Sequence, residues 1–264
     1  MTVSFLGVLG SIQAEDSGNV SLVISGGDSS VLVDVSGSPL ELLQKAGVDP
    51  LSLEAVFLTH SHTDHLYGLP SLIHNLWLLK RDKPLAFYAN RETISCARSL
   101  CAVFDLEAKK GMFPLEWREA EGSITVGSVR CESFVVRHGV PTTGFIFTEH
   151  GKKIVYTADT MPLEEYPAAA AGPDLLIHEA GGTEDDRQKL ISGGHSSGAD
   201  AARAAKQIGA KKLLLCHLPH KKENRAAILA QARSVFKETE IPRPFVPYCI
   251  NSGRIVSQTA YRTG

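Results

Sequence analysis

The sequence predicts an α/β fold in which two β-sheets pack together and helices cover their outer faces. Short runs rich in valine, leucine and isoleucine are separated by clusters of glycine, serine and aspartate, a pattern typical of strands joined by turns. Helical patterns follow the strands, and this order of strands and then helices occurs twice, which favours two sheets with helices outside. The 264 residues are 43% apolar and 21% charged, a composition that can bury a sizeable core.

The first half of the chain is predicted to begin with antiparallel strands, because turn residues separate its first three apolar runs. The next run, residues 55–59, has the length of a strand and ends abruptly in a histidine-rich segment. The expected strands are residues 3–8, 20–25, 31–35 and 55–59, and the expected helices are residues 38–46, 69–80 and 91–104.

The second half repeats the order of strands and then helices. The expected strands are residues 129–137, 144–148, 153–158, 174–177 and 212–216, and the expected helices are residues 197–208 and 223–236. No linker rich in proline, glycine and serine divides the halves, since residues 167–173 form too short a tract. We therefore expect a single domain over residues 1–264.

Charge and cysteine content narrow the function classes. Lysine and arginine number 27 against 29 for aspartate and glutamate, a formal charge of -2, so global attraction to nucleic acid or an anionic membrane is not expected, although a local basic groove is compatible. No apolar stretch reaches the roughly eighteen residues of a membrane span. Residues 1–18 lack the positive start of a secretory signal, so we expect a cytoplasmic location. Five cysteines without a C-x-x-C pair predict buried free thiols.

The most informative segment is His60-Ser61-His62-Thr63-Asp64-His65, directly after the predicted strand 55–59. Imidazole and carboxylate groups are ligands that suit Zn²⁺, Mn²⁺ or Fe²⁺. Alternation in an extended loop directs His60 and His62 to the same side, which leaves Asp64 and His65 to face a second ion. The segment therefore predicts a metal site.

Further ligands are expected at the ends of other strands, because a sheet can deliver distant residues to one edge. His138, Asp159 and His217 each follow an apolar run of strand length. Taken singly, such a residue is more often a turn or cap residue. Together they complete a His/His/His set and an Asp/His/His set, with one carboxylate able to bridge.

The sequence resembles the metallo-β-lactamase superfamily, whose H-x-H-x-D-H signature is present in full at residues 60–65. It is similar to the ribonuclease Z branch at Leu66-Tyr67-Gly68-Leu69-Pro70, at Phe5-Leu6-Gly7, at residues 175–180 and at Gly194-His195-Ser196-Ser197. This resemblance covers nearly the whole chain. It implies a four-layer αβ/βα sandwich with two divalent metal ions at one edge. Zn²⁺ is preferred as the ion, with Mn²⁺ or Fe²⁺ as alternatives.

Carried over residue by residue, the resemblance implies the following ligands: His60, His62 and His138 for the first metal, Asp64, His65 and His217 for the second, and Asp159 as the bridge. The catalytic candidates are Asp64, His195 and Glu179. In the enzymes that the chain resembles, the histidine equivalent to His195 assists departure of the leaving group, and an acidic residue, matched here by Glu179, orients it. Ser197 and Asp200 fit a helix-capping pattern beside His195. We expect His178, at the end of a buried-looking strand, to be a core residue.

One departure from the ribonuclease Z pattern bears on the substrate. Those enzymes carry a long arm for the transfer-RNA elbow between the third histidine and the bridging aspartate, whereas 20 residues separate His138 from Asp159 here. The predicted strands 144–148 and 153–158 fill most of that interval. We therefore expect a substrate other than tRNA. The resemblance also implies a homodimer.

These features predict a binuclear metal-dependent hydrolase, in which a metal-bridging hydroxide attacks a small or cyclic phosphodiester or a short RNA. A lactone, thioester or arylsulfate hydrolase would use the same ligands, and the motif residues do not separate these substrates. A di-iron redox protein is disfavoured because the signature has histidine, and not glutamate, at position 62. A non-catalytic interaction protein is disfavoured because all seven ligand positions are filled.

Overall fold

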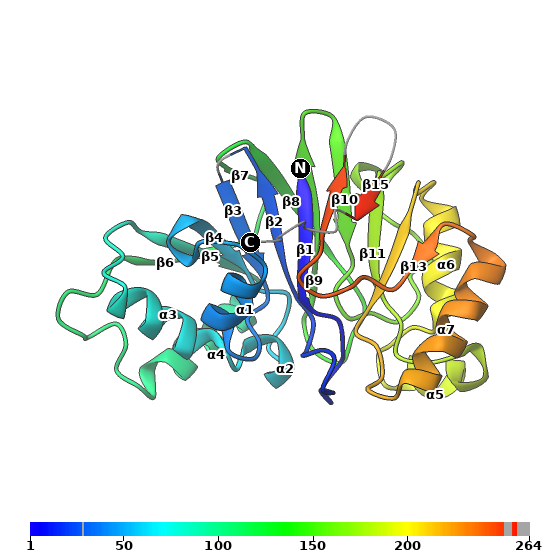
Figure 1. Cartoon of the computed structure of the whole chain (residues 1–264), viewed down its shortest axis with the longest axis horizontal. Helices are drawn as coiled ribbons and strands as arrows, with labels where there is room; N and C mark the ends of the chain where they lie inside the picture. The colour runs from blue at the N-terminus through cyan, green and yellow to red at the C-terminus, as the bar shows by residue number, and fades with distance from the viewer. Residues whose placement is uncertain (28, 251–254, 258–264) are drawn as a thin grey trace, which may run out of the picture.

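The computed structural model describes residues 1–27, 29–250 and 255–257. Across this part of the chain, two mixed β-sheets face each other and helices lie on both outer sides (Figure 1). The predicted αβ/βα sandwich is confirmed. The prediction of one domain over residues 1–264 stays a prediction, since residues 28, 251–254 and 258–264 lie outside the described ones.

The first sheet has the strand order β15-β14-β1-β2-β3-β4-β5-β6. Its first half is antiparallel, as predicted for β1, β2 and β3, and its second half, from β3 to β6, is parallel. The bounds are β1 (Thr2–Gly7), β2 (Ser21–Gly26), β3 (Ser29–Val33), β4 (Leu53–Phe57), β5 (Leu85–Ala89), β6 (Leu115–Glu119), β14 (Pro247–Ile250) and β15 (Ile255–Ser257).

The second sheet has the strand order β13-β12-β11-β10-β9-β8-β7. β10, β11, β12 and β13 are parallel, whereas β7, β8, β9 and β10 pair antiparallel. The bounds are β7 (Ser123–Val126), β8 (Val129–Val135), β9 (Thr143–Glu149), β10 (Lys152–Tyr156), β11 (Leu175–Glu179), β12 (Leu213–Cys216) and β13 (Thr239–Glu240).

Helices cover each sheet on the side away from its partner sheet (Figure 1). On the side of the first sheet lie α1 (Pro39–Lys45), α2 (Thr63–Leu66), α3 (Leu69–Leu78) and α4 (Arg91–Ala102). On the side of the second lie α5 (Arg187–Ser192), α6 (Gly198–Gln207) and α7 (Lys222–Val235). Short 3-10 turns occur at Pro50–Ser52, Ala168–Ala170 and Glu184–Asp186.

Strand alternation divides the apolar side chains between two cores. In β4, Phe57 packs into the core between the sheets, while its neighbours Val56 and Leu58 join the core beneath α1, α3 and α4, as the two-residue period of a strand requires. Between the sheets, the Phe57 ring packs edge-on against the rings of Phe145 and Phe147. The distances between ring centroids are 5.2 Å and 5.4 Å. These rings couple the first sheet to the second.

The structure adds the strands β5, β6, β7, β13, β14 and β15 and the helices α2 and α5 to the elements expected from the sequence. The extended loop expected over residues 60–65 is therefore extended only as far as His62, after which α2 begins. β6 carries charged residues on a partly exposed strand, and β7 is four residues long. Neither has the apolar run that marked the central strands. Within the described part of the chain, none of the helices combines the length and apolar character that crossing a bilayer requires.

We predict that Asp174, just before β11, contributes to stability in a pH-dependent way. Its buried carboxylate accepts hydrogen bonds from Lys153 N at 3.0 Å and from Lys211 Nζ at 2.8 Å. Burial opposes ionisation, but these bonds and the lysine charges lower the pKa of Asp174 below 3.8. A carboxyl group with a lowered pKa stabilises the fold at pH values above its ordinary pKa. This stabilisation is lost as the pH falls through the pKa of the folded state.

Asp174→Asn should therefore lower the free energy of unfolding by about 1–2 kcal/mol at pH 7, and by clearly less at pH 3. Urea denaturation at the two pH values measures both quantities, with the exposed Asp185→Asn as the matched control. An equal loss at both pH values would contradict the electrostatic origin of the effect.

Candidate metal centre

The predicted site residues converge at one edge of the sandwich because they follow strands that end at that edge. His60 follows β4 and Asp159 follows β10, while His217 comes directly after β12. His138 follows β8, which is antiparallel to β9 as β10 is, so β8 and β10 run in the same direction. The carboxyl ends of such strands lie together. The two sheets meet here through a hydrogen bond from Thr143 N to Thr59 O, at 3.0 Å.

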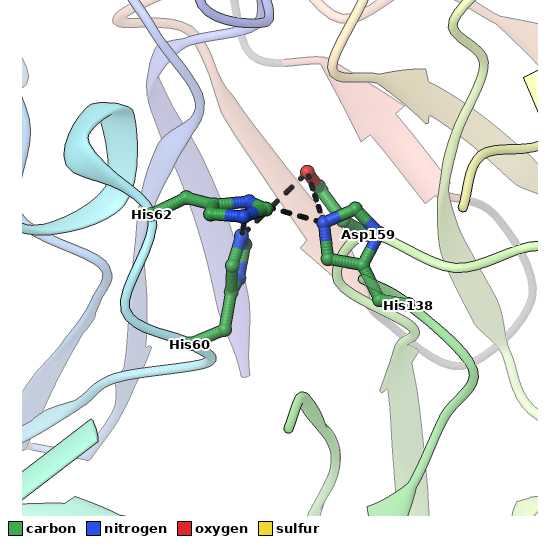
Figure 2. Close-up of side chains that lie close together, drawn as sticks. All are labelled: His60, His62, His138 and Asp159. Atoms are coloured by element: carbon green, nitrogen blue, oxygen red, sulfur yellow. Dashed lines mark hydrogen bonds and ion pairs between the residues drawn. The ribbon is translucent and has the colours of Figure 1, made fainter. Parts of the chain in front are cut away.

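Figure 2 shows one cluster, in which His60, His62, His138 and Asp159 point toward one another. Nδ1 of His62 lies 3.1 Å from Nε2 of His60 and 3.1 Å from Nε2 of His138. Oδ2 of Asp159 lies 3.8 Å and 3.9 Å from these two Nε2 atoms. One ligand atom from each residue can thus approach a common point, and this group could hold a metal ion.

A second cluster of Asp64, His65 and His217 adjoins the first. Oδ2 of Asp64 lies 3.7 Å from Nε2 of His65 and 3.4 Å from Nε2 of His217. Oδ2 of Asp159 also lies 3.5 Å and 3.1 Å from the same two nitrogens. The Asp159 carboxylate is therefore shared by both clusters, and the structure brings all seven predicted ligand residues together.

Hydrogen bonds behind the rings fix which nitrogen faces the site. Nδ1 of His65 donates to Oδ2 of Asp34 at 2.8 Å, which leaves the Nε2 lone pair of His65 directed inward. The Thr59 hydroxyl donates to Asp34 at 2.9 Å, so it accepts from Nδ1 of His60 at 2.9 Å. Nδ1 of His138 donates to Gly194 O at 2.8 Å. His60, His65 and His138 thus present Nε2 lone pairs to the site.

The inward-facing atoms fit cations better than they fit one another. Within the described residues, no hydrogen-bond partner reaches the buried Nε2 of His65 or the buried Oδ1 of Asp159. Such unpaired buried groups are costly unless something binds them. Imidazole lone pairs grouped around a carboxylate are the donor set of Zn²⁺, Mn²⁺ or Fe²⁺. The residues present therefore fit divalent metal ions.

Burial and neighbouring charges bear on the protonation of the cluster. Burial, with added repulsion from His65, lowers the pKa of His60 to about 2, so His60 stays neutral and able to ligate. Burial likewise lowers the pKa of His62 and of His138. Burial alone would raise the pKa of Asp159, but the surrounding histidines, His217 first, hold it well below 3.8. Asp159 is therefore an ionised carboxylate.

His195 lies at the mouth of these clusters and is held by Glu179. Nδ1 of His195 donates to Oε1 of Glu179 at 3.0 Å, and the same oxygen accepts from Thr160 N at 2.6 Å. Burial opposes protonation of His195, but the hydrogen bond and the charge of Glu179 raise the pKa of His195 to about 9. Nε2 of His195 is thus the nitrogen left to face a substrate, beside Asp159 and His217.

The loop that carries His195 is shaped by glycine and by a helix cap. Gly194 has φ +82°, and a Cβ there would come within 2.8 Å of Nδ1 of His138, so a larger residue would displace that ring. Ser197 and Asp200 form a capping box at the start of α6, as the sequence predicted. The cap fixes the direction of the helix and hence the place of the preceding loop.

Left-handed backbone conformations also occur at the site. Asp34, Ala158 and His217 have φ values of 58°, 57° and 49°. Residues with a Cβ adopt this region at an energetic cost, which tends to be retained where a side chain must be aimed for function. Here the conformation occurs at three places: at the predicted ligand His217, at Ala158, which precedes Asp159, and at Asp34, which supports His65.

Asp34 and Thr59 support the site and were not predicted from the sequence. A signal was present, because Asp34 is a charged residue within the apolar run 31–35, where a carboxylate needs a partner. His178 is buried, and its Nδ1 donates to Glu179 O at 2.8 Å, so the expectation of a core histidine is confirmed. Cys96 is exposed, contrary to the expectation of buried thiols.

The sandwich fold and the shared histidine and aspartate clusters define a metal-binding αβ/βα protein. Comparison with known families agrees, because residues 30–218 match the beta-lactamase superfamily domain. The chain belongs to this superfamily.

Two ribonucleases Z are similar to this chain over most of their length. Ribonuclease Z from Methanothermobacter thermautotrophicus is 24% identical over 91% of this chain and 94% of its own, and ribonuclease Z from Pyrococcus horikoshii is 28% identical over 92% and 94%. Among solved structures, the metallo-beta-lactamase fold protein YhfI from Bacillus subtilis has a TM-score of 0.80 at 26% identity, covering 94% of this chain and 98% of YhfI.

We predict that Asp34 sets metal affinity through the histidines that it orients. Asp34→Asn places an NH₂ group against donors, because the carboxylate accepts from Thr59 N, the Thr59 hydroxyl and His65 Nδ1. Zn²⁺ affinity, measured by competition with a chromophoric chelator, should fall about 10–100-fold. Asp105→Asn, at another aspartate with positive φ, is the matched control. Unchanged affinity in Asp34→Asn would contradict this role.

Proposed function

We propose that the protein is a binuclear metal-dependent phosphodiesterase. The observation that carries the proposal is the pair of adjoining donor clusters that share Asp159, with His195 held beside them by Glu179. Relatives named ribonuclease Z that align with nine-tenths of the chain support hydrolysis of phosphodiester bonds.

In this proposal His60, His62 and His138 hold the first metal ion, and Asp64, His65 and His217 hold the second. Asp159 would serve as a ligand to both ions, since its Oδ2 faces histidines of both clusters. We propose Zn²⁺ as the resident ion, with Mn²⁺ or Fe²⁺ compatible with the same donors. When bound, the ions supply Lewis acidity that activates water near neutral pH and offsets negative charge on the phosphoryl oxygens.

His195 is proposed to protonate the departing oxygen. Its Nδ1 is engaged by Glu179, so a proton held at Nε2 is available on the side of the metal clusters. Glu179 is fully buried and acts as a positioning residue, because it fixes the ring through Nδ1 and stabilises the imidazolium. Asp64, proposed as both ligand and catalytic residue, keeps its carboxylate toward the reacting centre, where it also accepts from the Ser11 hydroxyl at 3.1 Å.

We propose a small or cyclic phosphodiester or a short RNA as substrate. Between His138 and Asp159 the chain forms β9, a turn and β10, so this interval holds no arm for a transfer RNA. The alignments to the two ribonucleases Z span 295 and 305 positions, more than the 264 residues of this chain. Those relatives therefore contain segments without a counterpart here, which supports a substrate other than tRNA. The homodimer stays a prediction.

Asp159→Asn should abolish both metal pairing and turnover. The substitution keeps the shape of the side chain but removes the charge that both clusters share, so the metal content should fall below two ions per chain. Elemental analysis of the purified protein, together with turnover of bis(p-nitrophenyl) phosphate, measures the effect.

The same assay includes a lactone and an aryl sulfate, because the metal ligands alone do not select the ester. Turnover of the phosphodiester by the wild type, exceeding that of the other two, is the expected result. Two bound ions with turnover confined to the lactone or the sulfate would overturn the substrate class.

His195→Ala should slow hydrolysis most for substrates whose leaving group must be protonated as it departs. For thymidylyl-thymidine, whose leaving group is an alkoxide, turnover should fall about 10²–10⁴-fold. For the p-nitrophenyl ester of thymidine 5′-monophosphate the loss should be much smaller, because p-nitrophenolate leaves without a proton.

Glu179→Gln keeps a hydrogen-bond acceptor for His195 but removes the charge, so it should show the same selectivity with a smaller loss. Equal losses for the two substrates in His195→Ala would contradict proton donation by this residue.

A further inference from the structure

A second cavity opens beside the candidate metal centre, on the side of α2, α3 and α4. Its volume is about 630 Å³, and Thr63, Tyr67, Leu100 and Phe104 are among the residues that line it. α2 contains the end of the histidine-rich segment and α3 follows it, while α4 lies next to them on the outer face of the first sheet (Figure 1). We call this cavity the helical pocket.

The helical pocket adjoins the metal centre. The hollow over the metal ligands has a volume of about 470 Å³ and is lined by His62, Asp64 and Asp159, and it shares Thr63 and Tyr67 with the helical pocket. The Tyr67 hydroxyl donates to Asn19 Oδ1 at 3.0 Å and accepts from Gln13 Nε2 at 2.6 Å. These bonds hold the Tyr67 ring as the wall between the two spaces.

The lining of the helical pocket is apolar and aromatic. Leu100 forms part of one wall, and Tyr67, His74 and Phe104 contribute aromatic side chains. Phe104 is 56% exposed, a large apolar surface left in contact with water at the rim. Cavities of this size that combine apolar walls with a few polar groups are typical ligand sites, and aromatic faces favour a planar ring that stacks on them.

We propose that the helical pocket binds an aromatic ring of nucleobase type that belongs to the non-leaving part of the substrate. This inference rests on the proposed phosphodiesterase function, and it narrows the substrate class. A phosphoryl group over Asp159 and His62 places its ester substituent next to Thr63 and Tyr67, where the second cavity begins. Binding energy from the ring then positions the reacting phosphorus.

The first test varies the non-leaving group at constant chemistry. The p-nitrophenyl esters of 2-deoxyribose 5-phosphate and of thymidine 5′-monophosphate share a leaving group and a sugar, and only the second carries a base. The wild type should prefer the thymidine ester in kcat/KM by about tenfold or more. Leu100→Trp, which fills the pocket, and Phe104→Ala, which removes a ring, should lower that preference about tenfold, mainly through KM.

Val103→Ala is the matched control, because Val103 adjoins Phe104, is 73% exposed and does not line the cavity. It should keep the wild-type preference. Turnover of both esters without any preference for thymidine would overturn the pocket assignment and leave the proposed function intact.

The second test measures binding without turnover. Cys96 lines the helical pocket and is exposed, whereas Cys101, Cys131 and Cys216 are buried. Thymidine 5′-monophosphate should slow alkylation of Cys96 by N-ethylmaleimide in the metal-loaded protein, and methyl phosphate should not, as followed by peptide mass spectrometry. In Leu100→Trp the protection should be lost.

Protection of Cys96 without hydrolysis of either ester would support the pocket and reject the proposed function. Sedimentation velocity tests the alternative that a second copy of this chain occupies the helical pocket. A dimer that dissociates in Leu100→Trp, with no protection of Cys96 by the nucleotide, would overturn the proposal.

Discussion

The structure of the site depends on one constraint: a buried, ionised Asp159 carboxylate surrounded by imidazole nitrogens that present lone pairs to it. Burial of this negative charge is costly unless positive charge compensates it. The supporting hydrogen bonds of His60 and His138 use their Nδ1 protons elsewhere, so these two rings face Asp159 as acceptors. Divalent cations resolve this conflict, and their binding energy would hold the surrounding strand ends together.

The sandwich delivers this arrangement because its strand directions place distant residues at one edge. Three parallel strands of the second sheet, β10, β11 and β12, lead into Asp159, Glu179 and His217, and β4 of the first sheet leads into His60. The Phe57, Phe145 and Phe147 contacts fix the spacing between the sheets behind the site. A rigid core therefore supports ligands that lie on loops.

The same ligand set serves many ester substrates, so selectivity has to come from the surroundings of the metals. In this chain, the Glu179–His195 pair lies on one side of the clusters and is the proposed proton donor, and the helical pocket lies on the other side with an apolar surface. In the proposed reaction the two features act separately, one on the leaving group and one on the substituent that stays on phosphorus. This separation lets a compact chain act on phosphodiesters through local contacts.

The sequence by itself determined the fold class, the central strands and the seven residues that converge, because strand periodicity and the His60–His65 motif are local signals. It did not identify Asp34 and Thr59 as supporting residues, since the contacts of Asp34 with Thr59 and His65 depend on the pairing of β3 with β4. The short polar edge strands β6 and β7 were also decided by pairing and not by local pattern. The helical pocket depends on how α4 packs beside α2 and α3, and such packing of separate segments exists only once the chain has folded.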